Sequence, residues 1–165
     1  MKNGSLLTVV GRAESVNLPT LGIKKIPAKV DTGADSSAIW CSKLKIVDSS
    51  LECVFFGKGS PFYTGKKVVF KNGDIDLTRV TSSFGHKELR YKVKIPMTIK
   101  GRTIKASFTL TDRSTKLYPI LIGRSTLQGK FLVDVSRGTP LHEEEGSRQK
   151  RLRAEMRRLK KELNL

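Results

Sequence analysis

The chain has 165 residues, of which 38% are hydrophobic and 28% are charged, a composition typical of one globular domain with a buried core. Its 32 Lys and Arg residues against 15 Asp and Glu give a net charge of +17, which favours polyanionic partners. No apolar run approaches the roughly 20 residues that span a bilayer, and the first residues lack a secretory signal pattern. We therefore expect a cytoplasmic protein.

Short apolar segments bounded by turn residues recur along the first 140 residues and predict an all-β fold. A change in composition after Pro140 divides the chain into a β domain, residues 1–140, and a basic helical tail, residues 141–165. Strands are expected at residues 6–10, 26–30, 51–56, 119–122 and 131–134, and a short helix is expected after Gly123, through "RSTLQ".

Two hairpins are predicted between these strands. In the first, "KKVVF" and "DIDLTRV" flank Asn72-Gly73, a dipeptide suited to a turn with positive φ. In the second, apolar and polar residues alternate over 91–99 and 104–110, on either side of Gly101, as expected for strands with one buried face. Pro96 cannot donate a backbone hydrogen bond and places its strand near an edge or a bulge.

The tail carries eight bases and two acids from Gly146 onward. Its apolar residues form one thin stripe at helical spacing, which favours an exposed helix. The helix is either a solvated tail or a contact for an acidic partner. The stripe consists of Leu152, Met156, Leu159 and Leu163.

The stretch "AKVDTGADSSAIW" places a carboxylate, Asp31, at the end of an apolar strand and follows it with Thr32 and Gly33. One interpretation is a turn closed by an Asx hydrogen bond. The other is half of a catalytic carboxylate pair. About ninety residues later, "YPILIGRSTL" leads an apolar triplet into Gly123 and Arg124. Each motif alone is weak, but the two in this order, with hairpins between them, are more specific.

These segments resemble the retropepsin-like aspartic proteases over about residues 10–138. Within that superfamily they are most similar to bacterial proteins named ATP-dependent zinc proteases, a family associated with ribosomal-protein glutamate ligases. The resemblance implies a retropepsin-like closed barrel, with one short helix after the "IGR" motif and a basic C-terminal helix beyond it. The segments that carry it are "KVDTGADSSA", "VTSSFGHKELR", "TLTDR", "YPILIGR" and "FLVD".

The family name implies zinc and ATP, but the residues do not. The chain has no HExxH helix and no GxxxxGK[ST] loop. Its two histidines and two cysteines have no zinc-site spacing. We therefore expect no metal and no cofactor.

The resemblance assigns Asp31 as the catalytic residue. Each chain carries one DTG loop, so the enzyme is expected to be a C2 homodimer in which the two Asp31 carboxylates meet and share one proton. The ionised partner activates water, and the protonated partner donates to the scissile carbonyl oxygen. By the same resemblance, the Thr32 hydroxyl holds the two loops together and Ala34 forms the pocket wall. Gly33 lets the backbone approach the carboxylates and the substrate.

Two further elements are implied beside the loop. Asp35 and the Gly123-Arg124 motif would form a bidentate clamp facing the substrate, although an ordinary surface ion pair is the alternative. The hairpin over residues 54–80 is additional to minimal retropepsins and has no assigned role. The flap that covers the catalytic pair is expected at Ser82, Ser83, Phe84 and Gly85.

The sequence thus predicts an aspartic peptidase that acts as a homodimer on a peptide or protein substrate, with acidic or glutamate-rich substrates favoured by the charge and by the family's association. An association with the ribosome or a glutamate ligase follows from the same resemblance. The alternative is a non-catalytic binding module that docks on RNA, the ribosome or an acidic partner. The intact DTG motif favours the enzyme. Membrane binding is disfavoured because the tail has no Trp or Phe anchor.

Overall fold

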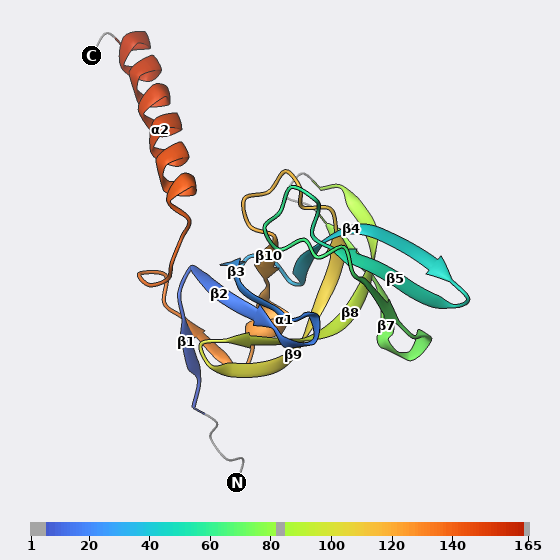
Figure 1. Cartoon of the computed structure of the whole chain (residues 1–165). Coiled ribbons are helices and arrows are strands. Elements are labelled where there is room, and N and C mark those ends of the chain that lie inside the picture. The colour runs from blue at the N-terminus through green and yellow to red at the C-terminus, as the bar shows by residue number, and fades with distance from the viewer. Residues whose placement is uncertain (1–5, 82–84, 164–165) are drawn as a thin grey trace.

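The computed structural model describes residues 6–81 and 85–163, and β-strands dominate it (Figure 1). Two 3₁₀ turns, one short helix and one long helix complete it. In chain order the elements are β1 (Thr8–Val10), β2 (Ala13–Leu18), η1 (Pro19–Leu21), β3 (Ile23–Val30), β4 (Ser37–Val47), β5 (Ser50–Phe55), β6 (Lys67–Phe70), η2 (Asn72–Asp74), β7 (Ile75–Thr81), β8 (Lys87–Ile99), β9 (Arg102–Thr111), β10 (Ile120–Ile122), α1 (Arg124–Leu127), β11 (Phe131–Val133) and α2 (His142–Glu162).

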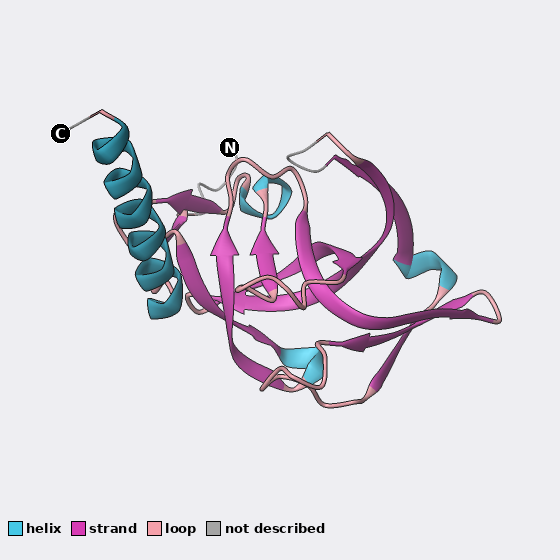
Figure 2. Ribbon diagram, turned by 90° about the horizontal axis from the view of Figure 1, so that it is seen from above, coloured by secondary structure: helices cyan, strands magenta, loops and turns pink. Residues whose placement is uncertain are grey.

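The main sheet is ring-like. Strand pairing runs β10-β3-β2-β8-β9-β4, and β4 then pairs back onto β10. Beyond this ring, β5 and β6 extend from β4, β7 pairs with β8, and a separate parallel pair joins β1 to β11. Figure 2 shows the strands curving around the central region, with α2 to one side. The all-β prediction and the short helix after Gly123 are confirmed, and the closed barrel stays a prediction.

The second predicted hairpin is confirmed as β8–β9. Lys100 and Gly101 form its two-residue turn with φ values of 49° and 75°, the left-handed region that such a turn requires. Pro96 faces Lys105 of β9. On its other side it lies between the stretch of β8 that pairs with β7 and the stretch that pairs with β2, so its missing donor breaks no pairing. The inward residues of the hairpin are fully buried: Val93, Ile95, Met97, Ile99, Ala106 and Phe108.

The first predicted hairpin is wrong. β6 pairs with β5, and β7 pairs with β8 along its whole length. Asn72–Asp74 forms η2, and neither Asn72 nor Gly73 has a positive φ. Asn-Gly permits a tight turn but does not impose one, and the edge-to-face contact of Phe70 with Phe55 holds β6 against β5. Within the segment 54–80, β6 therefore joins the β5–β6 pair and β7 joins the β7–β8 pair. The segment is not a hairpin of its own.

The predicted C-terminal helix is present as α2, which projects away from the sheet in Figure 1. The Leu141 N–H, just before the helix, donates a 3.0 Å hydrogen bond to the Tyr118 hydroxyl. The apolar stripe of α2 is exposed. Within the described residues, no helix has an apolar stretch of the length that crosses a bilayer. The division at residue 140 stays a prediction.

Candidate active site

The two motifs singled out in the sequence lie side by side. β3 ends at Val30 beside β10, and the two strands run parallel. The Asp31 N–H donates a 2.9 Å hydrogen bond to the Ile122 carbonyl, which ties the end of β3 to the end of β10. The loop that starts at Asp31 and the helix that starts at Arg124 therefore leave the sheet at the same place.

The DTG loop is closed by the predicted Asx hydrogen bond. The Gly33 N–H donates to Asp31 Oδ1 at 2.9 Å, and the Ala34 N–H reaches the Asp31 carbonyl at 3.3 Å. Asp31 is half-buried, while Thr32 and Gly33 are exposed. The two interpretations of this motif are thus compatible, because the turn fixes the orientation of the carboxylate at the surface and leaves it accessible.

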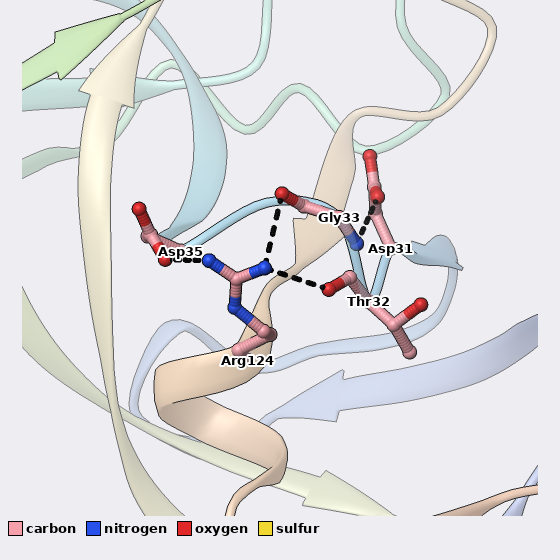
Figure 3. Close-up of polar contacts among 5 residues, drawn as sticks. All are labelled: Asp31, Thr32, Gly33, Asp35 and Arg124. Atoms are coloured by element: carbon pink, nitrogen blue, oxygen red, sulfur yellow. Dashed lines mark hydrogen bonds and ion pairs between the residues drawn. The ribbon is translucent and has the colours of Figure 1, made fainter.

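Arg124 holds the other side of the loop. Its guanidinium forms an ion pair with Asp35, and its Nη1 donates to the carbonyls of Thr32 at 3.3 Å and Gly33 at 3.5 Å. In Figure 3 the Asp31 carboxylate points away from this guanidinium. Both members of the ion pair are well exposed, so the pair alone contributes about 0–1 kcal/mol. The main effect of the Arg124 guanidinium is to orient the loop, because one planar group contacts several loop atoms at once.

The start of α1 packs directly against the loop backbone. The Arg124 N–H donates to the Ala34 carbonyl at 2.8 Å, and the Ser125 N–H donates to the Asp35 carbonyl at 3.0 Å. A Cβ on Gly123 would lie 2.6 Å from the Ser36 carbonyl. Only glycine allows this close approach.

A buried polar network under the loop was not predicted from the sequence. Ser37 Oγ accepts from the Gly123 N–H at 3.0 Å and lies 2.7 Å from Thr126 Oγ1. The Thr109 hydroxyl donates to the Ser37 carbonyl at 3.0 Å. All three side chains are buried, so the network joins β4, β9 and α1 beneath the DTG loop. Its partners are 72 to 89 residues apart, and no local pattern relates them.

Replacing Ser37 by Ala is expected to lower the free energy of unfolding by about 1–3 kcal/mol, because it leaves the buried Gly123 N–H without its acceptor. Chemical denaturation measures the change. Ser125→Ala, at an exposed position of α1, is the matched control and should change stability by less than about 0.5 kcal/mol. Equal effects of the two substitutions would show that the network does not support the site.

The predicted flap lies in the segment that connects β7 to β8, whose last pair is Thr81 with Lys87. Ser82, Ser83 and Phe84 lie outside the described residues. Gly85 is exposed, with a φ of 79°. The flap assignment stays a prediction.

A cleft of about 270 Å³ opens beside the loop. Residues 33–36 form one wall, and β7 and β8 form the other. Three arginines line it, namely Arg79, Arg90 and Arg113. No sequence pattern assigns a role to any of them, since they lie on three separate segments and only the fold brings them together. Arg113 ends the "TLTDR" segment, one of those that carry the family resemblance.

The described residues contain no group of three or more His, Cys, Asp and Glu side chains that could hold a metal ion. Cys41 and Cys53 are free thiols buried on the adjacent strands β4 and β5. The hydrogen bond with Cys41, together with burial, raises the pKa of the Cys53 thiol, so it stays protonated. A mechanism without metal or cofactor remains our prediction.

The comparison with protein families gives one match that covers most of the chain. A family model described as retropepsin-like aspartic endopeptidase RimB matches residues 9–143. Among solved structures, a protein of unknown function from Legionella pneumophila superposes with a TM-score of 0.60. That match covers 79% of this chain and 95% of the other, and its 20% identity supports the fold alone.

Curated relatives are longer proteins. Two proteins named probable alpha-L-glutamate ligase, from Shewanella pealeana and Shewanella halifaxensis, are 28% and 29% identical over 130 residues. A protein of the same name from Desulfotalea psychrophila is 24% identical over 128 residues. These matches cover 76–78% of this chain but only 28% of each relative. The similarity therefore concerns one segment of each ligase-named protein.

Proposed function

Since the chain belongs to the RimB-like family of retropepsin-like aspartic endopeptidases, we propose that it is an aspartic peptidase that acts as a homodimer. The observation that carries this proposal is the DTG loop. Its Asp31 carboxylate is oriented by the Gly33 N–H, and Arg124 holds the loop from the opposite side. One chain supplies one such carboxylate, and a second copy supplies the other by two-fold symmetry.

The chemistry then follows from two carboxyl groups that share one proton. The ionised Asp31 takes a proton from a water molecule, whose oxygen attacks the scissile carbonyl carbon. The protonated Asp31 of the second copy donates its proton to the carbonyl oxygen. Collapse of the tetrahedral intermediate breaks the C–N bond. The Asp31 that took the proton from water gives it to the leaving amine, and the other Asp31 takes back a proton from a hydroxyl of the intermediate, which restores the pair. Thr32 is exposed beside Asp31, and we propose that it contacts the second loop.

We further propose that the substrates are acidic or glutamate-rich peptides. The net charge of +17 favours such substrates by long-range attraction. The relatives that carry a similar segment are named glutamate ligases, which suggests a role on glutamate-containing chains. A peptidase that opposes a ligase would cleave the bonds that the ligase forms.

Mixing wild-type chains with Asp31→Asn chains tests the homodimer. If each active unit needs two Asp31 carboxylates, an equal mixture that has been refolded together should retain about one quarter of the activity of the same amount of wild-type protein. Active monomers would retain about one half. Hydrolysis of a glutamate-rich peptide is the readout. A linear dependence on the wild-type fraction would contradict the shared site.

The exposed basic helix α2 favours a second candidate function, docking on an acidic partner such as RNA, a ribosome surface or a glutamate ligase. Binding of this kind weakens steeply as salt rises, because counterions are released. A chain that binds such a partner but cleaves no peptide at any concentration would support docking over catalysis.

A further inference from the structure

The cleft beside the DTG loop concentrates positive charge. Arg79 comes from β7, Arg90 from β8, and Arg113 from the segment that follows β9. Arg79 is exposed, whereas the side chain of Arg90 is only 19% exposed and Arg113 is half-buried. Guanidinium groups are rarely withdrawn from water together unless an anion meets them.

The charges in the cleft are not balanced by its own acids. Among the described residues that line it, Asp35 is the single carboxylate, and it is already paired with Arg124. Glu88 accepts from Arg90 Nε at 3.0 Å and Nη2 at 2.8 Å, but its side chain is 58% exposed. Glu88 therefore partly screens the guanidinium of Arg90, and the guanidinium groups of Arg79 and Arg113 line the same cleft.

Arg113 has a fixed orientation in the cleft beside the DTG loop. Its Nε donates to the Tyr118 carbonyl at 2.9 Å, which fixes the plane of the guanidinium and leaves its two Nη groups as a fork. Burial lowers the pKa of Arg113, the positive charge of Arg90 lowers it further, and the charge of Asp31 opposes both effects. Arg113 and Arg90 line the same cleft, and one wall of that cleft is formed by residues 33–36, which follow Asp31 in the loop. A carboxylate entering the cleft would relieve the repulsion between the arginines.

We propose that Arg79, Arg90 and Arg113 form a subsite that binds a carboxylate of the substrate next to the peptide bond held at Asp31. This inference rests on the proposed peptidase function and adds the residues that select the substrate. The carboxylate is either an acidic side chain or the α-carboxylate at the C-terminus of the peptide. Both would make charge-assisted hydrogen bonds to the guanidinium fork.

Four peptides of one sequence test the subsite: Glu or Gln at the variable position, each with a free or an amidated C-terminus. We expect kcat/KM of the wild-type enzyme to favour a carboxylate over its amide by about tenfold or more. Arg113→Gln should bring this ratio close to one, and Arg79→Gln should reduce it. Lys45→Gln, which removes one exposed charge on β4 outside the cleft, should leave the ratio unchanged. The Glu/Gln and acid/amide pairs identify which carboxylate is bound.

Binding separates this inference from the proposed function. Calorimetry of the same peptides with the Asp31→Asn chain needs no catalysis, and Arg113→Gln in that background should weaken carboxylate binding about tenfold or more. If no peptide is cleaved but this loss is seen, the peptidase proposal fails and the subsite stands. If Arg113→Gln does not fold, Arg79→Gln and Arg113→Lys carry the same comparison. If the arginine variants show the same kcat/KM ratios and peptide affinities as the Lys45→Gln control, the subsite proposal is wrong.

Discussion

Asp31→Asn is expected to lower kcat/KM for peptide cleavage by at least about 10²–10⁴-fold, because it removes the group that accepts the proton from water. The fold should survive the change. The Asn side-chain oxygen can still accept the Gly33 N–H that closes the loop, and Asp31 is only half-buried. Steady-state kinetics and thermal unfolding, measured on the same preparation, separate the two effects.

Asp74→Asn is the matched control for this substitution. Asp74 is an exposed carboxylate in η2, away from the DTG loop, and its replacement should leave both activity and stability unchanged. An Asp31→Asn enzyme that cleaves within about tenfold of the wild-type rate would be inconsistent with a catalytic carboxylate, since general acid–base catalysis contributes more than this.

The second large effect is expected at Gly123. A Cβ at this position would lie 2.6 Å from the Ser36 carbonyl and 2.9 Å from the Ala34 carbonyl oxygen. Both contacts are with backbone, so Gly123→Ala must push the DTG loop away from α1. We expect a loss of about 1–3 kcal/mol of folding free energy. We also expect a fall in kcat/KM of about 100-fold, because displacing catalytic groups by about 1 Å has this cost.

Gly73→Ala provides the comparison. Its Cβ would meet nothing within 4 Å, and its φ is not positive, so alanine fits without strain. Denaturation and kinetics of both variants should show a defect for Gly123→Ala alone. A Gly123→Ala enzyme with wild-type kinetics would mean that the approach of α1 to the loop does not position Asp31.

The sequence predicts strands well where alternation is regular, as in β8 and β9, and it predicts that these two pair. It misplaces the partners of β6 and β7. Asn72-Gly73 suggested a hairpin, yet η2 forms there because β6 and β7 each pair with another strand. Conversely, the β4–β5 hairpin turns at Asp48 and Ser49, both with positive φ. Asp-Ser is a weaker turn signal than Asn-Gly, so this hairpin could not be predicted locally. Pairing is decided by side-chain packing across the sheet.

The candidate site also has parts that could be predicted from the sequence and parts that could not. The DTG loop and the Gly123-Arg124 motif could be predicted because each is a continuous stretch with a recognisable order of residue types. The Ser37–Thr126–Thr109 network and the three arginines could not, because each joins residues from different strands. Serine, threonine and arginine are common at surfaces and turns. They acquire a role here only through the ring of strands that brings them together.

The distance between the two Asp31 carboxylates in the assembled protein tests the central claim most directly. A structure of the active species should show two chains related by a two-fold axis, with these carboxylates in hydrogen-bond contact, about 3 Å apart. Peptide hydrolysis by a species that stays monomeric, or by a dimer whose Asp31 carboxylates lie far apart, would contradict the account.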